Sequence, residues 1–487
     1  MTEEFQNTYQ DVKKKATAGM GWNYFSFGLG KTLNIATTAV LAHLLAPEYF
    51  GQVALATLAI EYLSVLSDLG LGSALVQRKN NINKAANIAF TLNLGVGIFL
   101  SFVSYIIAPY VANFFNEPQV VSILRWLGLT FFISAVGSVH RILLQKNLSF
   151  QKKIIPELGN ISIKAIVSVG MAFAGFGVWS LVVGQIVGVS IAAILLWVLM
   201  PWRPEISWDN AIGKELFKFG FPIMGNNAIT TWEENFDYFI IGLIYTSADL
   251  GVYTLAYRLP QALVLSILWT MTDVLFPTFS SLQDQKDKLK TAFLSVLKYV
   301  ELLVTPLCLG MFIAADPLIR VLFGEQWIDA IPILRALSLY VWVVSIGYHV
   351  GDVYKAIGRP DLLLKISIPM FFIRIFLLWL GAQFSLVGVG VAHLVAGIFS
   401  ATFRYFVAAH FLKITLKDII RELSAFVCGV FLALFSLIAM YLTRYSSPVL
   451  QLIMIVFFGG VGYIGAVWFF ERKSVNNLLS LINFRKN

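Results

Sequence analysis

Long apolar segments make up most of this sequence. They restrict the possible folds more than any other feature. A membrane-crossing helix needs roughly 20 mostly apolar residues, and fourteen stretches meet that requirement. They cover residues 19–45, 51–76, 86–112, 119–144, 158–176, 178–200, 216–246, 251–280, 292–323, 330–356, 362–381, 385–408, 421–443 and 448–470. The longest internal connection is residues 201–215, which is too short for a soluble catalytic domain. The sequence therefore predicts an all-α integral membrane protein with about fourteen transmembrane helices that is not an enzyme.

The composition supports this class. Apolar residues make up 58% of the chain and charged residues only 13%, whereas soluble domains have about 25% charged residues. The net charge of +9 lies in short connections rather than on one soluble face, so we expect no nucleic-acid partner. Cys308 and Cys428 both fall in apolar segments, which does not indicate a disulfide framework.

The distribution of basic residues predicts the topology. Lys13, Lys14 and Lys15 precede the first span, the connection 46–50 has no Lys or Arg, and the next connection is basic again. This alternation continues along the chain, with Arg444 as the exception. Basic connections stay in the cytoplasm, so fourteen spans place both termini there. The polar start contains no apolar signal segment, and we expect a short surface helix before the first span.

An internal repeat predicts two similar halves. Ile123-Leu124-Arg125 recurs as Ile333-Leu334-Arg335, and residues 48–51 loosely match residues 248–251. Spans 1–6 then correspond to spans 7–12 as a parallel repeat. We expect two pseudo-symmetric six-helix lobes around a central cavity plus two extra C-terminal helices. The expected divisions are an N-terminal lobe (1–200), a cytoplasmic linker (201–215), a C-terminal lobe (216–408), and spans 13–14 with a cytoplasmic C-terminus (409–487).

Polar side chains interrupt several spans at helical spacing. A charge in hydrocarbon costs roughly 2.5–3.5 kcal/mol or more, so it normally faces a cavity or a partner. Lys31, Asn34 and Thr38 share one face of the first span. Similar faces carry Glu61 and Asp68 in the second span, Glu233, Glu234 and Asp237 in the seventh, Arg258 and Gln261 in the eighth, and Lys298, Glu301 and Thr305 in the ninth. These faces predict a common hydrated space, although opposite charges could instead pair to fix helix packing, for example Lys31 with Glu61 or Asp237.

Known catalytic and nucleotide motifs do not account for these residues. Gly30-Lys31-Thr32 resembles the end of a phosphate-binding loop, but Phe25 stands where that motif needs its first glycine. The sequence contains no H-E-x-x-H motif, no G-x-S-x-G motif and no Cys/His cluster for a metal. We therefore predict no catalytic residues, no metal site and no cofactor.

Residues 41–80, LAHLLAPEYFGQVALATLAIEYLSVLSDLGLGSALVQRKN, resemble the polysaccharide transporters of the multidrug/oligosaccharidyl-lipid/polysaccharide (MOP) exporter superfamily. The resemblance is to the branch that exports lipid-linked repeat units for colanic-acid-like, teichuronic-acid-like or lipopolysaccharide polymers. Residues 177–188, 237–259 and 333–360 also resemble that branch, less specifically. It implies alternating access in the bacterial cytoplasmic (inner) membrane. The implied substrate is an oligosaccharide joined through diphosphate to a polyprenol of the undecaprenol type, flipped from the inner to the outer leaflet for surface polysaccharide biosynthesis.

This resemblance and the polar faces together define the candidate site. Cations inside the cavity would attract the diphosphate by charge-assisted hydrogen bonds, and the substrate-binding candidates are Lys31, Asn34, Arg258, Gln261 and Lys298. Because no ATP motif is present, we expect the energy to come from an ion gradient, the membrane potential or substrate mass action. For coupling to H⁺ or Na⁺ the candidates are Glu61, Asp68, Glu233, Glu234 and Asp237. The expected partners are membrane lipids and a polysaccharide polymerase, and the expected state is a monomer.

Two other functions fit parts of the sequence. Acidic residues outnumber basic ones within the spans, which suits a cation-coupled multidrug exporter of the same superfamily. A membrane glycan polymerase or ligase would act on the same glycan, but such enzymes typically carry a large outer loop that this chain lacks.

Overall fold

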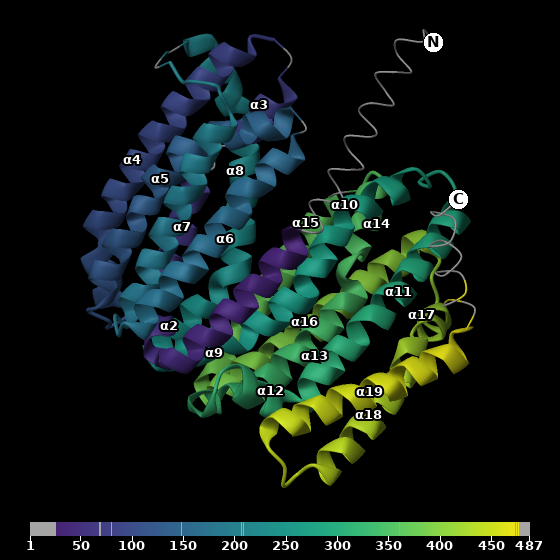
Figure 1. Ribbon diagram of the computed structural model, residues 1–487. Coiled ribbons are helices and arrows are strands. Elements are labelled where there is room, and N and C mark those ends of the chain that lie inside the picture. The colour runs from purple at the N-terminus through teal and green to yellow at the C-terminus, as the bar shows by residue number, and fades with distance from the viewer. Residues whose placement is uncertain are drawn as a thin grey trace. The chain divides into compact units, whose positions relative to one another are not determined.

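The structure, a computed structural model, describes residues 26–67, 70–78, 80–147, 149–205, 207, 209–359, 361–472, 474 and 476. Within these residues the chain is helical, without β-strands (Figure 1). The first half contains a helix over residues 26–44, α2 (Pro47–Ser67), α3 (Leu71–Gln77), α4 (Ile82–Phe114), α5 (Val120–Lys146), α6 (Phe150–Phe173), α7 (Val178–Leu199) and α8 (Asn210–Ile244). The expected surface helix before the first span lies outside the described residues.

The second half is also made of helices joined by short connections. It contains α9 (Ser247–Pro260), the π-helical turn η1 (Gln261–Leu265), α10 (Ser266–Ser280), α11 (Lys286–Ile313), α12 (Ala315–Leu322), the 3₁₀ turn η2 (Glu325–Trp327), α13 (Ala330–Tyr348), α14 (Val350–Ala356), α15 (Asp361–Phe384), α16 (Leu386–Leu412), α17 (Leu416–Glu422), α18 (Ser424–Leu442) and α19 (Pro448–Phe470). The predicted all-α class is confirmed.

Twelve helical segments of the described chain are long and apolar enough to cross a membrane. The other two expected spans fall on the helix over residues 26–44 and on α8, which carries Glu233, Glu234 and Asp237. The number fourteen and the lobe symmetry therefore stay predictions.

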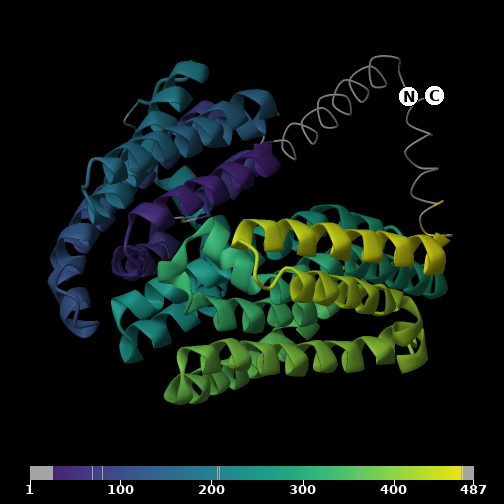
Figure 2. The same ribbon diagram turned by 60° about the horizontal axis from the view of Figure 1, so that its bottom comes forward.

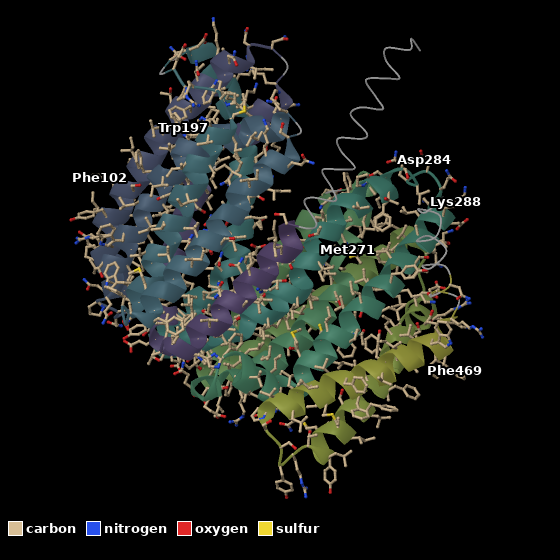
Figure 3. The ribbon with its side chains drawn as sticks, viewed as in Figure 1. Phe102, Trp197, Met271, Asp284, Lys288 and Phe469 are labelled. Atoms are coloured by element: carbon tan, nitrogen blue, oxygen red, sulfur yellow. The ribbon has the colours of Figure 1, made fainter. Side chains whose placement is uncertain are left out.

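The outer surfaces of these helices are apolar. Phe102 on α4 and Phe469 on α19 are 62% and 79% exposed, and both point away from the helices that carry them (Figure 3). Many other Phe, Ile, Leu and Val side chains are exposed in the same manner. Soluble monomers rarely expose apolar surface on this scale, so lipid must cover it, and the chain is a multi-pass membrane protein.

Two compact units divide the chain, Met1–Gly251 and Val252–Asn487. In the first unit, α8 packs along α2: the rings of Tyr62 and Trp232 stack at 4.6 Å, and Gly242 lies against Leu55 and Phe115. These contacts lie within the first unit, which contains α8 and ends at Gly251. The expected division into lobes at residues 201–215 stays a prediction.

Two helix starts cross very closely within the first unit. A Cβ atom added to Gly51 on α2 would lie 1.6 Å from the carbonyl oxygen of Ser247, and one added to Gly251 would lie 2.0 Å from that of Pro47. Only glycine permits this approach of two backbones. The two segments are those matched in the sequence repeat, residues 48–51 and 248–251.

Two apolar clusters pack in the described part of the second unit. One gathers Phe279, Phe293, Tyr354 and Tyr405 from α10, α11, α14 and α16. The other joins the antiparallel pair α18 and α19, which lie side by side (Figure 2), to the end of α11. Cys308 and Cys428 are free and buried, as expected from their apolar surroundings.

Several expected spans are interrupted by local backbone features. Gly70 adopts a left-handed conformation (φ 66°) between α2 and α3, within the stretch expected as one span over 51–76. The expected span over 292–323 is two helices, α11 and α12, and the span over 330–356 breaks between α13 and α14 at His349. Hydropathy reports the composition of a segment, so it does not register such breaks.

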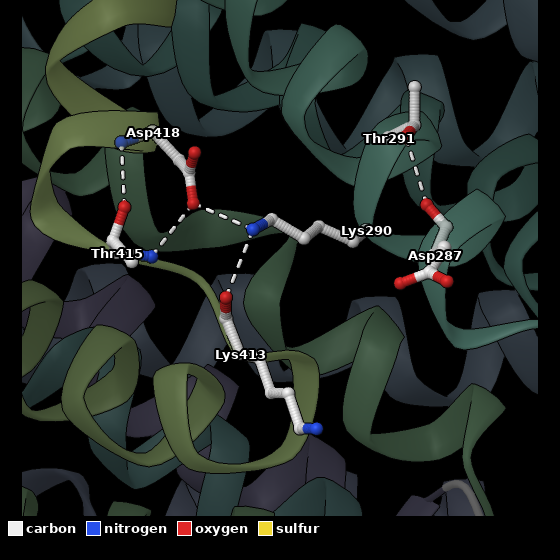
Figure 4. Close-up of polar contacts among 6 residues, drawn as sticks. All are labelled: Asp287, Lys290, Thr291, Lys413, Thr415 and Asp418. Carbon is white, nitrogen blue, oxygen red and sulfur yellow. Dashed lines mark hydrogen bonds and ion pairs between the residues drawn. The ribbon is translucent and has the colours of Figure 1, made fainter.

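The short helix α17 is fixed to α11 by a lysine. Thr415 and Asp418 form a capping box at its start, and Lys290 Nζ donates to Asp418 Oδ2 at 2.7 Å and to the Lys413 carbonyl at 2.9 Å (Figure 4). The hydrogen bond from Lys290, followed by those from Thr415, lowers the pKa of Asp418 to about 2. The carboxylate thus connects α17 to α11.

We expect Asp418→Asn to loosen α17, because the substitution removes the charge that holds Lys290 and caps the helix. Amide hydrogen exchange across residues 413–422 should become faster at neutral pH. In the wild-type protein the stabilisation is present above the unfolded carboxyl pKa of about 4 and is lost as the pH falls toward the lowered folded value. Asp287→Asn is the matched control, since the Asp287 carboxylate makes no ion pair within the described residues and only its backbone carbonyl accepts from Thr291 (Figure 4). Equal exchange in the two variants would contradict the assignment.

Candidate functional site

An acidic group lies on the facing surfaces of α2 and α8 in the first unit. Glu61 on α2 interacts electrostatically with Glu234 and Asp237 of α8. Asp237 is fully buried, Glu61 and Glu233 are partly buried, and Glu234 is exposed. Carboxylates that repel one another when ionised can relieve that repulsion by binding a proton or a cation. The structure therefore brings three of the five ion-coupling candidates together, and Asp68 lies outside the described residues.

Aromatic and amide groups border this acidic group. Tyr62, next to Glu61, donates from its hydroxyl to the carbonyl of Asn235 at 3.4 Å, and its ring stacks on Trp232. The Asn235 amide donates to the Thr231 carbonyl at 3.0 Å. These contacts hold the acidic faces of α2 and α8 against each other.

Lys31 and Asn34 lie on the helix over residues 26–44 in the first unit. Both are partly buried, and Lys31 Nζ is 5.4 Å from the centroid of the Phe27 ring. An ammonium group at this distance is attracted by the negative face of the ring. Lys31 lies in a helix, as the sequence predicts. Its role in binding stays a prediction.

Arg258 and Gln261 lie at the start of a π-helical turn in the second unit. Arg258 is partly buried near the end of α9, and Gln261 is the exposed first residue of η1. Pro260 stands between them, and π-turns are frequent at functional sites. Proline removes a helical hydrogen bond, so Pro260 was the available sequence signal for this local change, which hydropathy missed.

Lys298 has carboxylate partners near the end of the membrane domain. Its Nζ lies 2.7 Å from Glu471 Oε2 and 3.7 Å from Glu422 Oε2. Burial acts to raise the pKa of Glu471, but the hydrogen bond from Lys298 contributes to lowering it overall. This geometry makes Lys298 part of an ion-pair cluster joining α11 to α17 and to the end of α19, which is the pairing alternative raised for charges in the spans. Its contact with substrate stays a prediction.

The structure adds a polar site that the candidate residues did not include. Glu301 on α11 is fully buried beside Thr305, Trp342 and Ser345. The polar face predicted for the ninth span contained Glu301 and Thr305, but their pairing with Trp342 and Ser345 depends on contacts between helices. Among the described residues no group of three or more His, Cys, Asp or Glu side chains could hold a metal ion.

Solved structures with the same fold come from membrane transporters. The lipid II flippase MurJ in its inward closed conformation aligns with a TM-score of 0.73 at 15% identity, covering 94% of this chain and 100% of that one. An inward-facing multidrug resistance MATE transporter of the MOP superfamily aligns with a TM-score of 0.63 at 17% identity, covering 79% and 94%. At these identities the likeness shows the fold, which is that of a polytopic transporter.

The chain belongs to the family described as "Polysaccharide biosynthesis protein", which matches residues 40–332, more than half of its length. It is 27% identical to the teichuronic acid biosynthesis protein TuaB of Bacillus subtilis over 72% of this chain and 73% of that one. It is 25% identical to the lipopolysaccharide biosynthesis protein WzxC of Escherichia coli over 81% of each. The succinoglycan biosynthesis transport protein ExoT of Rhizobium meliloti is 27% identical over 67% and 66%. The resemblance seen in residues 41–80 is thereby confirmed.

Proposed function

We propose that this protein is a flippase. It moves polyprenyl-diphosphate-linked oligosaccharide repeat units from the inner to the outer leaflet of the cytoplasmic membrane, for surface polysaccharide biosynthesis. Its family membership over residues 40–332 carries this proposal, and relatives named for teichuronic acid, lipopolysaccharide and succinoglycan biosynthesis support it. In this proposal the protein is a transporter that works by alternating access, and it is not an enzyme.

The proposal includes a topology. Fourteen spans in two similar lobes, with two extra helices, place both termini in the cytoplasm of a bacterial cell. The helix over residues 26–44 and α8 supply the two spans beyond the twelve most apolar ones. The protein acts as a monomer that delivers its product to a polysaccharide polymerase.

The proposal also assigns roles to the intramembrane charges. Lys31 and Arg258, assisted by Asn34, Gln261 and Lys298, attract the diphosphate, because a diphosphate cannot enter hydrocarbon without charge-assisted hydrogen bonds. Glu61, Glu233, Glu234, Asp237 and Asp68 bind the coupling proton or sodium ion. The association of Glu61 with Glu234 and Asp237 supports this second role.

Deletion of the gene tests the function directly. Polyprenyl-diphosphate oligosaccharides are quantified by mass spectrometry, together with the polymer on the cell surface. We expect the lipid-linked repeat unit to accumulate and the polymer to disappear, and the mass of the sugar would identify the glycan. A catalytically inactive glycosyltransferase mutant of the same strain, which makes no repeat unit, is the control for polymer loss without accumulation.

The acidic group favours one other function. Carboxylates such as Glu61 and Asp237 suit a cation-coupled multidrug exporter, and MATE transporters share the fold. Unchanged lipids and polymer in the deletion strain, with increased sensitivity to cationic dyes, would replace the flippase proposal by this one.

A further inference from the structure

Among the residues that the structure describes, one buried carboxyl group in the second unit has only neutral hydrogen-bonding partners. Glu301 lies in the middle of α11 and is 0% exposed. Its Oε2 accepts from the indole N–H of Trp342 at 3.2 Å and lies 3.5 Å from the Thr305 hydroxyl. Its Oε1 lies 2.8 Å from the Ser345 hydroxyl oxygen. Buried polar groups need such partners, and every partner here comes from α11 or α13.

No positively charged group pairs with the Glu301 carboxyl among the residues that the structure describes. Within the described residues, no Lys, Arg or His forms an ion pair with Glu301. Lys298, one helical turn away, is held by Glu471 and Glu422 instead. An isolated carboxylate away from water costs several kcal/mol, which neutral donors offset only in part.

The remaining titratable groups around Glu301 do not supply a positive charge either. Cys308 on α11, Tyr405 on α16 and Tyr463 on α19 are close enough to interact with it electrostatically. His349, one turn beyond Ser345, directs its Nδ1 to Asp352 at 3.0 Å. An ionised Glu301 would therefore face groups that are neutral or already engaged.

The number of hydrogen atoms available around Ser345 indicates that the Glu301 carboxyl group is neutral. The Ser345 hydroxyl oxygen has two short contacts with oxygen atoms, 2.6 Å to the Trp342 carbonyl and 2.8 Å to Glu301 Oε1. A serine hydroxyl carries one hydrogen and a carbonyl oxygen carries none. If Ser345 donates to Trp342, the hydrogen in the contact with Glu301 must belong to the carboxyl group. A protonated Oε1 that donates to Ser345 satisfies both contacts at ordinary O–H···O distances.

We propose that Glu301 is a proton-binding site. Its carboxyl group is protonated in this conformation, donating to Ser345 while Trp342 and Thr305 hold Oε2. Release of the proton requires a new environment for the carboxylate, so occupancy of the site is linked to the packing of α11 against α13. Building on the proposed flippase function, this site carries a proton of the transport cycle, in addition to the acidic group formed by Glu61, Glu234 and Asp237.

Infrared difference spectroscopy of the purified full-length protein tests the site without any transport assay. The wild-type protein should show the C=O stretching band of a protonated carboxyl group, decreasing as the pH is raised. Glu301→Gln should remove this band. Glu471→Gln is the matched control, because Glu471 is also buried but is ion-paired with Lys298, and it should leave the band unchanged.

A second variant assigns the band if Glu301→Gln fails to fold. Ser345→Ala removes the acceptor of the carboxyl proton, so the band should shift in frequency and persist. A wild-type spectrum without the band, or a band that neither Glu301→Gln nor Ser345→Ala alters, would overturn the proposal.

The role in transport has its own readout. In cells producing Glu301→Gln, which stays neutral, lipid-linked oligosaccharide should accumulate as in the deletion strain. Glu157→Gln, which replaces a carboxylate whose side chain is 42% exposed on α6, should retain export. Full export by Glu301→Gln would overturn the role in the cycle. If the deletion itself causes no accumulation, the flippase proposal fails, and the spectroscopic result still decides whether Glu301 binds a proton.

Discussion

Replacing Lys31 with alanine is expected to abolish surface polymer while the protein still inserts into the membrane. Lys31 lies in the interior of the span predicted over residues 19–45, where a positive charge is costly unless it has a function or a partner. A hydrogen bond to a charged group contributes about 1.5–3 kcal/mol, so its loss would weaken binding of the diphosphate by roughly 10- to 100-fold. The measurement is the amount of lipid-linked oligosaccharide and polymer in the deletion strain carrying the variant.

Two further substitutions test whether the positive charge of Lys31, rather than any lysine of the chain, is needed for export. Lys31→Arg keeps a cation and should restore export at least partly, although the guanidinium has a different shape. Lys365→Ala removes a lysine whose side chain is 68% exposed, next to Asp361, and should export normally. Each variant's amount in the membrane fraction is measured by immunoblotting. Full polymer from Lys31→Ala at wild-type protein levels would remove Lys31 from the binding site.

The membrane class could be predicted from the sequence because hydropathy depends only on composition within a segment. The same property explains the errors in the boundaries. Residues 292–323 are mostly apolar and read as one span, yet the chain turns between α11 and α12 near Ala314. The sequence shows a glycine at position 70 but not its backbone conformation, which the structure shows to be left-handed.

The candidate site was predictable in part for a similar reason. Helical spacing shows which polar residues share a face of one helix, so the faces that carry Glu61 and Asp237 could be found. It cannot show which faces meet. Lys298 reaches Glu471 across more than 170 positions of the chain, and Glu301 reaches Ser345 on another helix. Both contacts depend on how α11 packs with its neighbours.

Adding one methyl group at Gly51 or at Gly251 is expected to destabilise the protein strongly. The new Cβ atom would lie 1.6 Å from the Ser247 carbonyl oxygen in Gly51→Ala and 2.0 Å from the Pro47 carbonyl oxygen in Gly251→Ala. These are backbone atoms that cannot rotate away, so the starts of α2 and α9 must separate. Overpacking costs about 1–3 kcal/mol and occasionally more, and the melting temperature of the detergent-solubilised protein should fall for each variant.

The double variant shows whether the two single variants lose stability through one shared helix–helix contact or through two independent clashes. One separation of the helices relieves both clashes, so Gly51→Ala with Gly251→Ala should cost clearly less than the sum of the single variants. Gly95→Ala on α4 is the matched control, because its Cβ would meet nothing within 4 Å. There the substitution should stabilise the helix by roughly 0.5–1 kcal/mol. Melting temperatures of Gly51→Ala and Gly251→Ala equal to that of the wild type would mean that the two backbones do not meet at these glycines, and additive losses would mean that the two contacts are independent.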